Sequence, residues 1–411
     1  MTAAPPALDA NAMPRIWAQP VAMLLPLLLG LYAVLDSWIF YVGNEQRIAY
    51  TLITGLSLVL AILGLPRTMA PPRAWALILA WAGICLLPLA PVLTQQTVMA
   101  NYVVGDLASM VLPLVLFVVM WSMPRMLRPA TALVPYAVLL GIAAAAAAVS
   151  PASYNERHAD PVILAFVLGW SYLMFGPGDS RGRLAWPFLL LLLFVAFSSG
   201  YRSSLAMWFL IGLMVQFLSR GARTAIVSGI ALLVAGSLYF ALTPAEVLQE
   251  QLAATRLDTL VGDEGDRSLE SRSLEVKDVA AAVATDWTPI NYIFGAGHGA
   301  TFKPVHSDPW RNINEHGTVH NIHITPVLLF FRYGLLGLGA FAALSFVTVA
   351  SFLRLRRRIR AGDRRLVEVV FTVGMAVYLF DAMRHVVLVD PAFSYTLAGF
   401  LRLRFAPHPT A

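Results

Sequence analysis

The sequence carries very little charge and almost no cysteine. Only 13% of its 411 residues are Asp, Glu, Lys or Arg, whereas soluble proteins have about 25%. Hydrophobic residues make up 58%, and the mean hydropathy is +0.70. This composition predicts an integral membrane protein. The single cysteine, Cys85, lies in an apolar run, so the sequence excludes an internal disulfide and a metal site built from several cysteines.

Apolar stretches recur along the whole chain and predict an all-α polytopic membrane protein with about twelve transmembrane helices. Segments in lipid must be helical, because their backbone polar groups find no water there. Several stretches are shorter than the roughly 20 residues that a spanning helix needs. The stretches are 21–41, 48–65, 74–93, 103–121, 131–150, 161–175, 184–198, 205–218, 224–242, 335–353, 366–388 and 391–403.

The arginines between these stretches predict an orientation. With the N-terminus in the cytosol, the inner side holds 18 arginines and the short outer loops hold 3, so both termini are expected to be cytoplasmic. One outer loop is long and contains twelve acidic residues against six basic ones, which argues against nucleic-acid binding. Three regions follow: a membrane bundle of about nine spans (1–242), a long outer loop with a helix near 269–284 (243–319), and about three C-terminal spans (320–411).

A polar cluster rich in histidine comes just before the tenth span. On a helix, His316, His320 and His323 would share one face at a spacing that metal ligands use. Glu315, however, precedes the first histidine, which breaks the order of a His-Glu-x-x-His zinc motif. The structural alternative is a polar first helical turn capped by Thr318.

The catalytic alternative makes His320 a general base. At a helix N-terminus the positive end of the helix dipole would keep an imidazole neutral, as a base requires. Pro326 would then break or kink the helix just inside the membrane.

Several charged residues lie in or beside apolar segments, where charge is costly. Arg202 is predicted at the outer surface, as a phosphate ligand or as an interfacial anchor. Arg272 has Glu275 three residues on, the spacing of a surface ion pair on a helix. Asp381 has the spacing to pair with Arg384, or with His385 as an alternative. Asp106 receives no role.

Three short motifs follow one another along the chain. They are Ser199-Gly200-Tyr201-Arg202-Ser203, then Arg272 followed by a helix and Phe294-Gly295-Ala296-Gly297-His298-Gly299, then His320-Asn321 and Gly334-Leu335-Leu336-Gly337-Leu338. In this order, the motifs resemble those of the O-antigen ligase and polymerase superfamily, and the resemblance covers about 196–338 in motif detail. A single long loop between the ninth and tenth spans is typical of the ligase branch. The interval between His320 and Gly334 is about one helical turn longer than usual in this family, which leaves the register of that helix open.

The resemblance implies a GT-C-like glycosyltransferase of the bacterial inner membrane, with its active site on the periplasmic face. It would move a glycan, with inversion, from undecaprenyl diphosphate to the lipid A-core oligosaccharide in lipopolysaccharide biosynthesis. His320 would be the general base, with no metal or other cofactor. The donor diphosphate would be held by Arg202, Arg272, Arg267 and Arg332, with support from Asn321, Ser199 and Tyr201.

Other functions stay open at this point. Within the family, the chain could polymerise lipid-linked repeat units of O-antigen, capsule or exopolysaccharide, or transfer oligosaccharide to protein. Outside it, the chain could be a transporter or flippase of lipid-linked glycans. A transporter would gather its charged residues at the bilayer midplane in broken helices, whereas the outer rim is predicted here.

Overall fold

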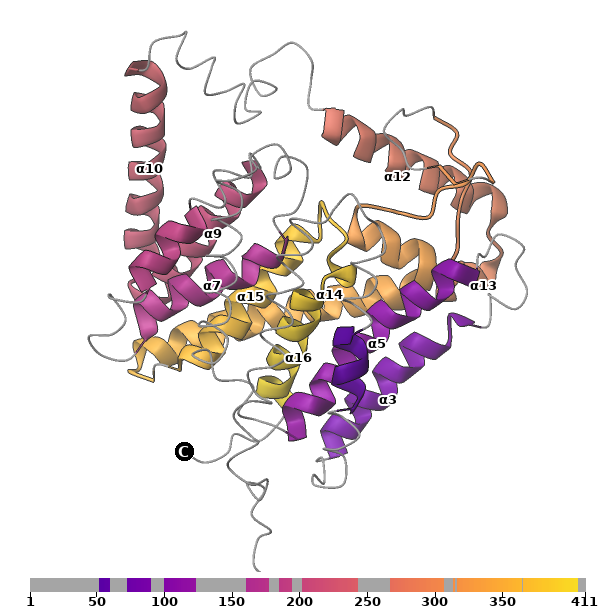
Figure 1. Cartoon of the computed structure of the whole chain (residues 1–411), viewed down its shortest axis with the longest axis horizontal. Coiled ribbons are helices and arrows are strands. Elements are labelled where there is room, and N and C mark those ends of the chain that lie inside the picture. The colour runs from indigo at the N-terminus through magenta and orange to yellow at the C-terminus, as the bar shows by residue number, and fades with distance from the viewer. Residues whose placement is uncertain are drawn as a thin grey trace, which may run out of the picture.

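The computed structural model describes residues 52–59, 72–89, 100–122, 160–176, 185–193, 202–242, 267–306, 313–314, 316–363 and 365–405. Within these ranges the chain is all-helical apart from loops, and its one β pairing is an isolated bridge between Phe302 and Val319. The helices, shown in Figure 1, are α3 (Pro72–Leu86), α5 (Ala100–Ser122), α7 (Asp160–Phe175), α9 (Arg202–Ser219), α10 (Ala222–Leu242), α12 (Arg267–Asp286), α13 (Pro289–Phe294), α14 (Thr325–Arg360), α15 (Leu366–Asp381), η5 (Val387–Val389) and α16 (Pro391–Phe405).

The helices fall where the apolar stretches predict them. Two are long and apolar enough to cross a membrane, namely Tyr102–Trp121 within α5 and the whole of α14. The helices α3, α7, α9, α10, α15 and α16 each coincide with a predicted span, while α14 is much longer than the stretch 335–353. The stretches 21–41 and 131–150 lie outside the described residues, so the number of about twelve spans stays a prediction.

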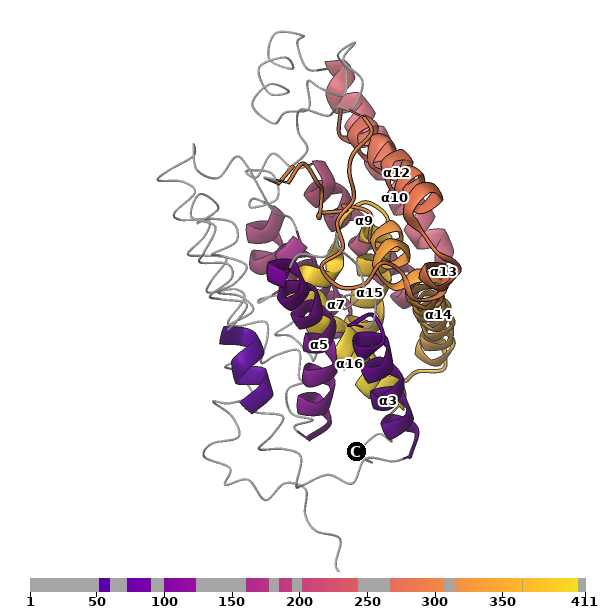
Figure 2. The ribbon, with the colours of Figure 1, turned by 90° about the vertical axis from the view of Figure 1, so that its right-hand side faces the viewer.

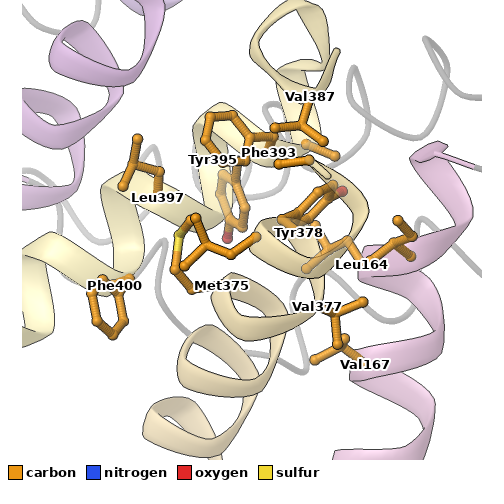
Figure 3. Packing of buried hydrophobic residues seen from close by; sticks show 14 of the residues in the cluster. Leu164, Val167, Met375, Val377, Tyr378, Val387, Phe393, Tyr395, Leu397 and Phe400 are labelled. Carbon is orange, nitrogen blue, oxygen red and sulfur yellow. The ribbon is translucent and has the colours of Figure 1, made fainter. Parts of the chain in front are cut away.

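The core of the bundle lies where α15 packs against α7, α14 and α16. Because α15 is apolar on every side, it is buried among these neighbours. Figure 3 shows Tyr378 of α15 beside Phe393 of α16 and Leu164 of α7, all three buried. Gly399 lets α16 approach α15 closely, because a side chain at this position would overlap the ring of Phe371.

Arginines tie several helices together at one end of the bundle. The Arg356 guanidinium donates to the Phe217 carbonyl and lies 3.8 Å from the centre of that ring, which joins the end of α14 to the end of α9. Arg402 lies 4.7 Å from the ring centre of Trp121 and joins the end of α16 to the end of α5. These arginines belong to the set for which the cytoplasmic side is predicted.

The opposite end of the bundle holds the start of α14 and the end of α15. The Thr325 N–H donates to the Ala382 carbonyl over 3.0 Å, and the Thr325 hydroxyl donates to the His385 carbonyl over 2.5 Å. Arg384 pairs with Asp381 at 2.7 Å, as the spacing of these two residues predicts. Consecutive C-terminal helices thus run in alternate directions, in agreement with the predicted alternation, and the side of the membrane that each end faces stays a prediction.

Candidate functional site

A sharp kink in α14 gives two backbone carbonyls to the loop that precedes the helix. Gly334 has φ 60° and ψ −152°, which is not helical. In an uninterrupted helix, the carbonyls of Phe331 and Arg332 would accept from N–H groups four residues further on. Here they accept from the loop, where Ala296 N donates to Phe331 O over 2.8 Å and Gly297 N donates to Arg332 O over 2.9 Å. The glycine turn after α13 is therefore hydrogen-bonded to the backbone of α14 at the kink.

Glycine is required on both sides of this contact. A Cβ atom on Gly334 would lie 2.5 Å from the backbone of Ile293, and one on Gly295 would overlap the backbone of α14. Both residues also have positive φ, which side chains disfavour. The predicted kink at Pro326 is wrong, because this proline lies in the first turn of α14, where a missing N–H costs nothing. The predicted cap Thr318 is also wrong, because Ile324 precedes the helix.

Three charged or titratable side chains meet beside the kink. Arg332 Nη1 donates to Asp106 Oδ1 over 2.5 Å, and Arg332 Nη2 donates to His320 Nε2 over 2.9 Å and to the His320 carbonyl over 2.8 Å. The other carboxylate oxygen of Asp106 accepts from Gly299 N over 2.7 Å. The guanidinium therefore bridges the carboxylate of α5 and the imidazole of the loop. We call Asp106, His320 and Arg332 the polar triad.

Both charged groups of this bridge are buried, and their removal from water costs free energy. Asp106 is 6% exposed and Arg332 is 5% exposed, so each charge needs the other. Asp106 received no role from the sequence, because its partners Gly299 and Arg332 come 193 and 226 residues later in the chain. The signal that could have singled it out is its position, as an acid in the first turns of a helix that is otherwise apolar.

His320 is held as a neutral imidazole of defined orientation. The ring of Tyr102, one helical turn before Asp106, stacks on it with centres 3.9 Å apart and planes 7° apart. His320 Nδ1 lies 3.3 Å from the Ala300 carbonyl, to which it can donate, and Nε2 then accepts from Arg332. Burial lowers the pKa of His320, and the nearby Arg332 charge lowers it further, whereas Asp106 opposes both. His320 is therefore neutral at pH 7, as a general base must be.

A second histidine, His298, is buried in the glycine turn that precedes the polar triad. His298 is fully buried, its Nε2 lies 2.8 Å from the Cys85 carbonyl, and its Nδ1 lies 3.2 Å from the Tyr333 hydroxyl. The carbonyl can only accept, so Nε2 carries the proton and Nδ1 accepts from the tyrosine. Burial also lowers the pKa of His298. The sequence predicts only a glycine turn here, and the histidine within that turn is the signal that could have revealed these contacts.

No model of a known protein family and no curated protein matches this chain. The family resemblance therefore rests on the motifs, and the residues that carry them fall into two groups. The loop and α14 residues lie together, as described above. Arg202 and Arg267 are the first residues of α9 and α12, but their side chains lie outside the described part of the chain, as do Ser199 and Tyr201. Asn321 is exposed beside His320.

The helix of the long loop, α12, is fastened to the site by two buried carboxylates on one of its faces. Glu275 accepts from the His323 backbone N–H over 2.5 Å and lies 3.0 Å from His323 Nδ1. One turn later, Asp278 lies 2.5 Å from His306 Nδ1 and also accepts from the His306 backbone N–H. The sequence predicts Glu275 on a solvated surface, beside Arg272, but this carboxylate is 4% exposed. The predicted position of Glu275 on a solvated surface is therefore wrong, because its carboxylate is buried against His323.

A group of basic side chains lies at the first turn of α14. Arg272, Arg384 and His323 act electrostatically on the His385 ring, and the carboxylate of Asp381, which pairs with Arg384, opposes them. We call the four basic residues the basic group. It lies at the first turn of α14, since the His385 carbonyl accepts from the Thr325 hydroxyl, and His323 is three residues from His320. Backbone geometry limits the distance between these two histidine Cα atoms to about 11 Å.

The predicted helical face of three histidines is wrong. Residues 316–324 are not helical, and Val319 pairs with Phe302 in the isolated bridge, so α14 begins only at Thr325. Among the described residues, no three His, Cys, Asp or Glu side chains are grouped so that they could hold a metal ion. The extra residues between His320 and Gly334 thus form an extended approach and a short helical segment before the kink.

Proposed function

We propose that this chain is a membrane glycosyltransferase that moves a glycan from undecaprenyl diphosphate to the lipid A-core oligosaccharide at the periplasmic face. One observation carries the proposal: His320 is neutral, oriented and partly exposed, and it contacts Arg332 within the polar triad. The triad lies at the end of the bundle opposite the arginines for which a cytoplasmic location is predicted. A base at this end suits a reaction at the outer surface of the inner membrane.

In the proposed reaction, a hydroxyl oxygen of the acceptor attacks the anomeric carbon of the donor sugar from the face opposite the diphosphate. The bond between that carbon and the diphosphate oxygen breaks, which gives inversion and releases undecaprenyl diphosphate. The proton of the hydroxyl passes to His320 Nε2. The diphosphate is already an activated leaving group, so the reaction requires neither ATP nor a metal.

The polar triad suits this proton transfer. In the reacting complex, the acceptor hydroxyl would replace Arg332 Nη2 as the hydrogen-bond partner of His320 Nε2. Asp106 Oδ1 lies 3.4 Å from the same nitrogen, where its charge would stabilise the imidazolium after proton transfer. Asp106 would thereby act both on the orientation of Arg332 and on the charge of the product state.

The donor diphosphate needs cations that can reach it. Arg332 is paired with Asp106 and could bind the diphosphate only by leaving this carboxylate. Arg272 is a second candidate, because it is partly exposed on α12 and the resemblance assigns it to the diphosphate. By resemblance, Arg202 and Arg267 complete the clamp, and together these cations would neutralise the charge that develops on the leaving group.

The direct test replaces His320 with Ala, and the exposed His316 of the same loop serves as the matched control. Loss of a general base lowers rates by about 10²- to 10⁴-fold, so we expect His320→Ala to lose transfer while the protein still inserts into the membrane. His316→Ala should keep normal transfer. If the two variants transfer glycan equally well, His320 is not the base.

The glycan profile of a deletion strain separates the ligase from its alternatives. Long chains that remain on undecaprenyl diphosphate indicate a missing ligase, whereas single repeat units indicate a missing polymerase. Glycans that accumulate on the cytoplasmic face would indicate a flippase, and an unmodified acceptor protein would indicate transfer to protein.

A further inference from the structure

The helix α14 is too long to fit inside a bilayer. Its 36 residues correspond to about 54 Å at 1.5 Å per residue, whereas the hydrocarbon core is about 30 Å thick. The first charged residue after its apolar run is Arg354, which marks one boundary of the core. Twenty residues earlier, or about 30 Å along the helix, lies Gly334. The other boundary therefore falls at the kink.

The segment between these two boundaries has the surface of a helix in lipid. One complete face of it is apolar and exposed, formed by Leu335, Gly339, Ala342, Phe346, Val349 and Leu353. The hydroxyls of Ser345 and Thr348 donate to carbonyls four residues earlier, over 2.9 and 2.8 Å, so both are satisfied without water. The side chain of Phe346 is 75% exposed, which indicates contact with lipid.

The short helix α13 lies at the level of the kink. It packs against α14, as Figures 1 and 2 show, and the backbone of Ile293 touches Gly334. Its side chains Ile290, Tyr292 and Ile293 are exposed by 62%, 42% and 47%. The ring of Trp287, just before α13, meets that of Tyr292 edge to face and packs against the aromatic rings in the first turns of α14. An exposed apolar helix with aromatic residues, at the edge of a lipid-facing surface, is typical of a membrane interface.

We propose that α13 is an interfacial helix that inserts Ile290 and Ile293 into the outer boundary of the hydrocarbon core. Its apolar surface continues that of α14, because Ile293 contacts the residue that precedes Leu335. The glycine turn that follows α13 carries Gly299, whose N–H binds Asp106. The membrane surface therefore fixes the depth of the polar triad, and Arg332, two residues before the kink, lies at the level of lipid phosphates. The inference rests on the proposed crossing of the membrane by α14.

The depth of single side chains tests this inference without any assay of activity. The natural cysteine is buried and is replaced first, as Cys85→Ser. A spin label is then placed at Ile290, Ile293, Phe346 or the exposed Ser273 of α12, one at a time, in vesicles of phosphatidylethanolamine and phosphatidylglycerol. Collision with oxygen, compared with collision with a water-soluble nickel chelate, gives the depth of each label.

We expect labels at Ile290 and Ile293 to lie about 5–10 Å below the lipid phosphates. The label at Phe346, about 18 Å along α14 from the kink, should lie near the midplane, and the label at Ser273 should be in water. A label at Ile290 that is as accessible to nickel as that at Ser273, or as deep as that at Phe346, overturns the interfacial position. A label at Phe346 in water overturns the crossing itself, and with it both this inference and the proposed location of the reaction.

Discussion

The substitution Asp106→Asn removes one charge from the polar triad and keeps its shape. The new side chain can still accept from Gly299 N, but the Arg332 guanidinium loses the counter-charge that lies 2.5 Å away. Removal of one partner of a buried ion pair costs about 3–5 kcal/mol, because the other charge stays buried. Arg332 keeps its bond to the His320 carbonyl, so we expect a loss near the lower limit, about 3 kcal/mol of the free energy of unfolding.

The assay is unfolding of the purified protein in mixed micelles by titration with a denaturing detergent, read out by circular dichroism. The variants Arg332→Gln and Asp106→Asn/Arg332→Gln complete a double-mutant cycle. The double variant should cost clearly less than the sum of the two single variants, because it leaves no unpaired charge. If the effects add to within about 0.5 kcal/mol, the two residues are not coupled and the reasoning fails.

A matched control uses an aspartate–arginine pair at the surface. Asp363 lies 2.5 Å from Arg358 and 3.1 Å from Arg365, and the exposed fractions of the three side chains are 38%, 33% and 45%. Water screens such pairs, so Asp363→Asn should leave the unfolding midpoint nearly unchanged. A loss as large as that of Asp106→Asn would mean that the assay responds to any loss of charge and not to burial.

Three further predictions address the kink, the histidines and the proposed clamp. Gly334→Ala should prevent stable folding, whereas Gly339→Ala in the same helix should be tolerated, because a Cβ there meets nothing within 4 Å; thermal stability in detergent compares them. Burial lowers the pKa values of His298 and His320 below the usual 6.5, so both are neutral at pH 7. Stability should therefore hold at pH 7 and fall as the pH decreases below 6.5, where histidines of the unfolded chain gain protons first, and the transfer rate should fall once His320 itself is protonated; pH profiles of both check this, and a rise on acidification contradicts it. Arg202→Lys keeps the charge but loses two-pronged binding, so it should reduce transfer, and full activity in the same assay would leave Arg202 as an anchor.

The sequence predicts local features of this protein well. Apolar stretches locate the helices, because burial in lipid or in a helix core requires long apolar segments in either case. The spacing of Asp381 and Arg384 predicts their ion pair, because a helix brings residues three apart together. The conjunction of His320 with a glycine motif singles out the region where the polar side chains meet.

Contacts between distant segments escape prediction from the sequence. Nothing in the local pattern links Asp106 to Arg332, and their pairing depends on how α5 and α14 pack. The kink is predicted at Pro326 because proline breaks helices, yet a proline in the first helical turn is harmless. The structure kinks at Gly334 instead, because the turn after α13 must approach the helix backbone there. A glycine needed for a contact looks the same in the sequence as any other.

During synthesis of the chain, Asp106 is made before Arg332, and it has to wait for this partner. The two residues are 226 positions apart, so at roughly 5–20 residues per second the aspartate is made about 10–45 s before its partner. For that interval, an acid in the first turns of the apolar helix α5 is without its counter-charge. A chain that ends before α14 would never leave this state, and its Asp106 carboxylate would stay without the guanidinium partner.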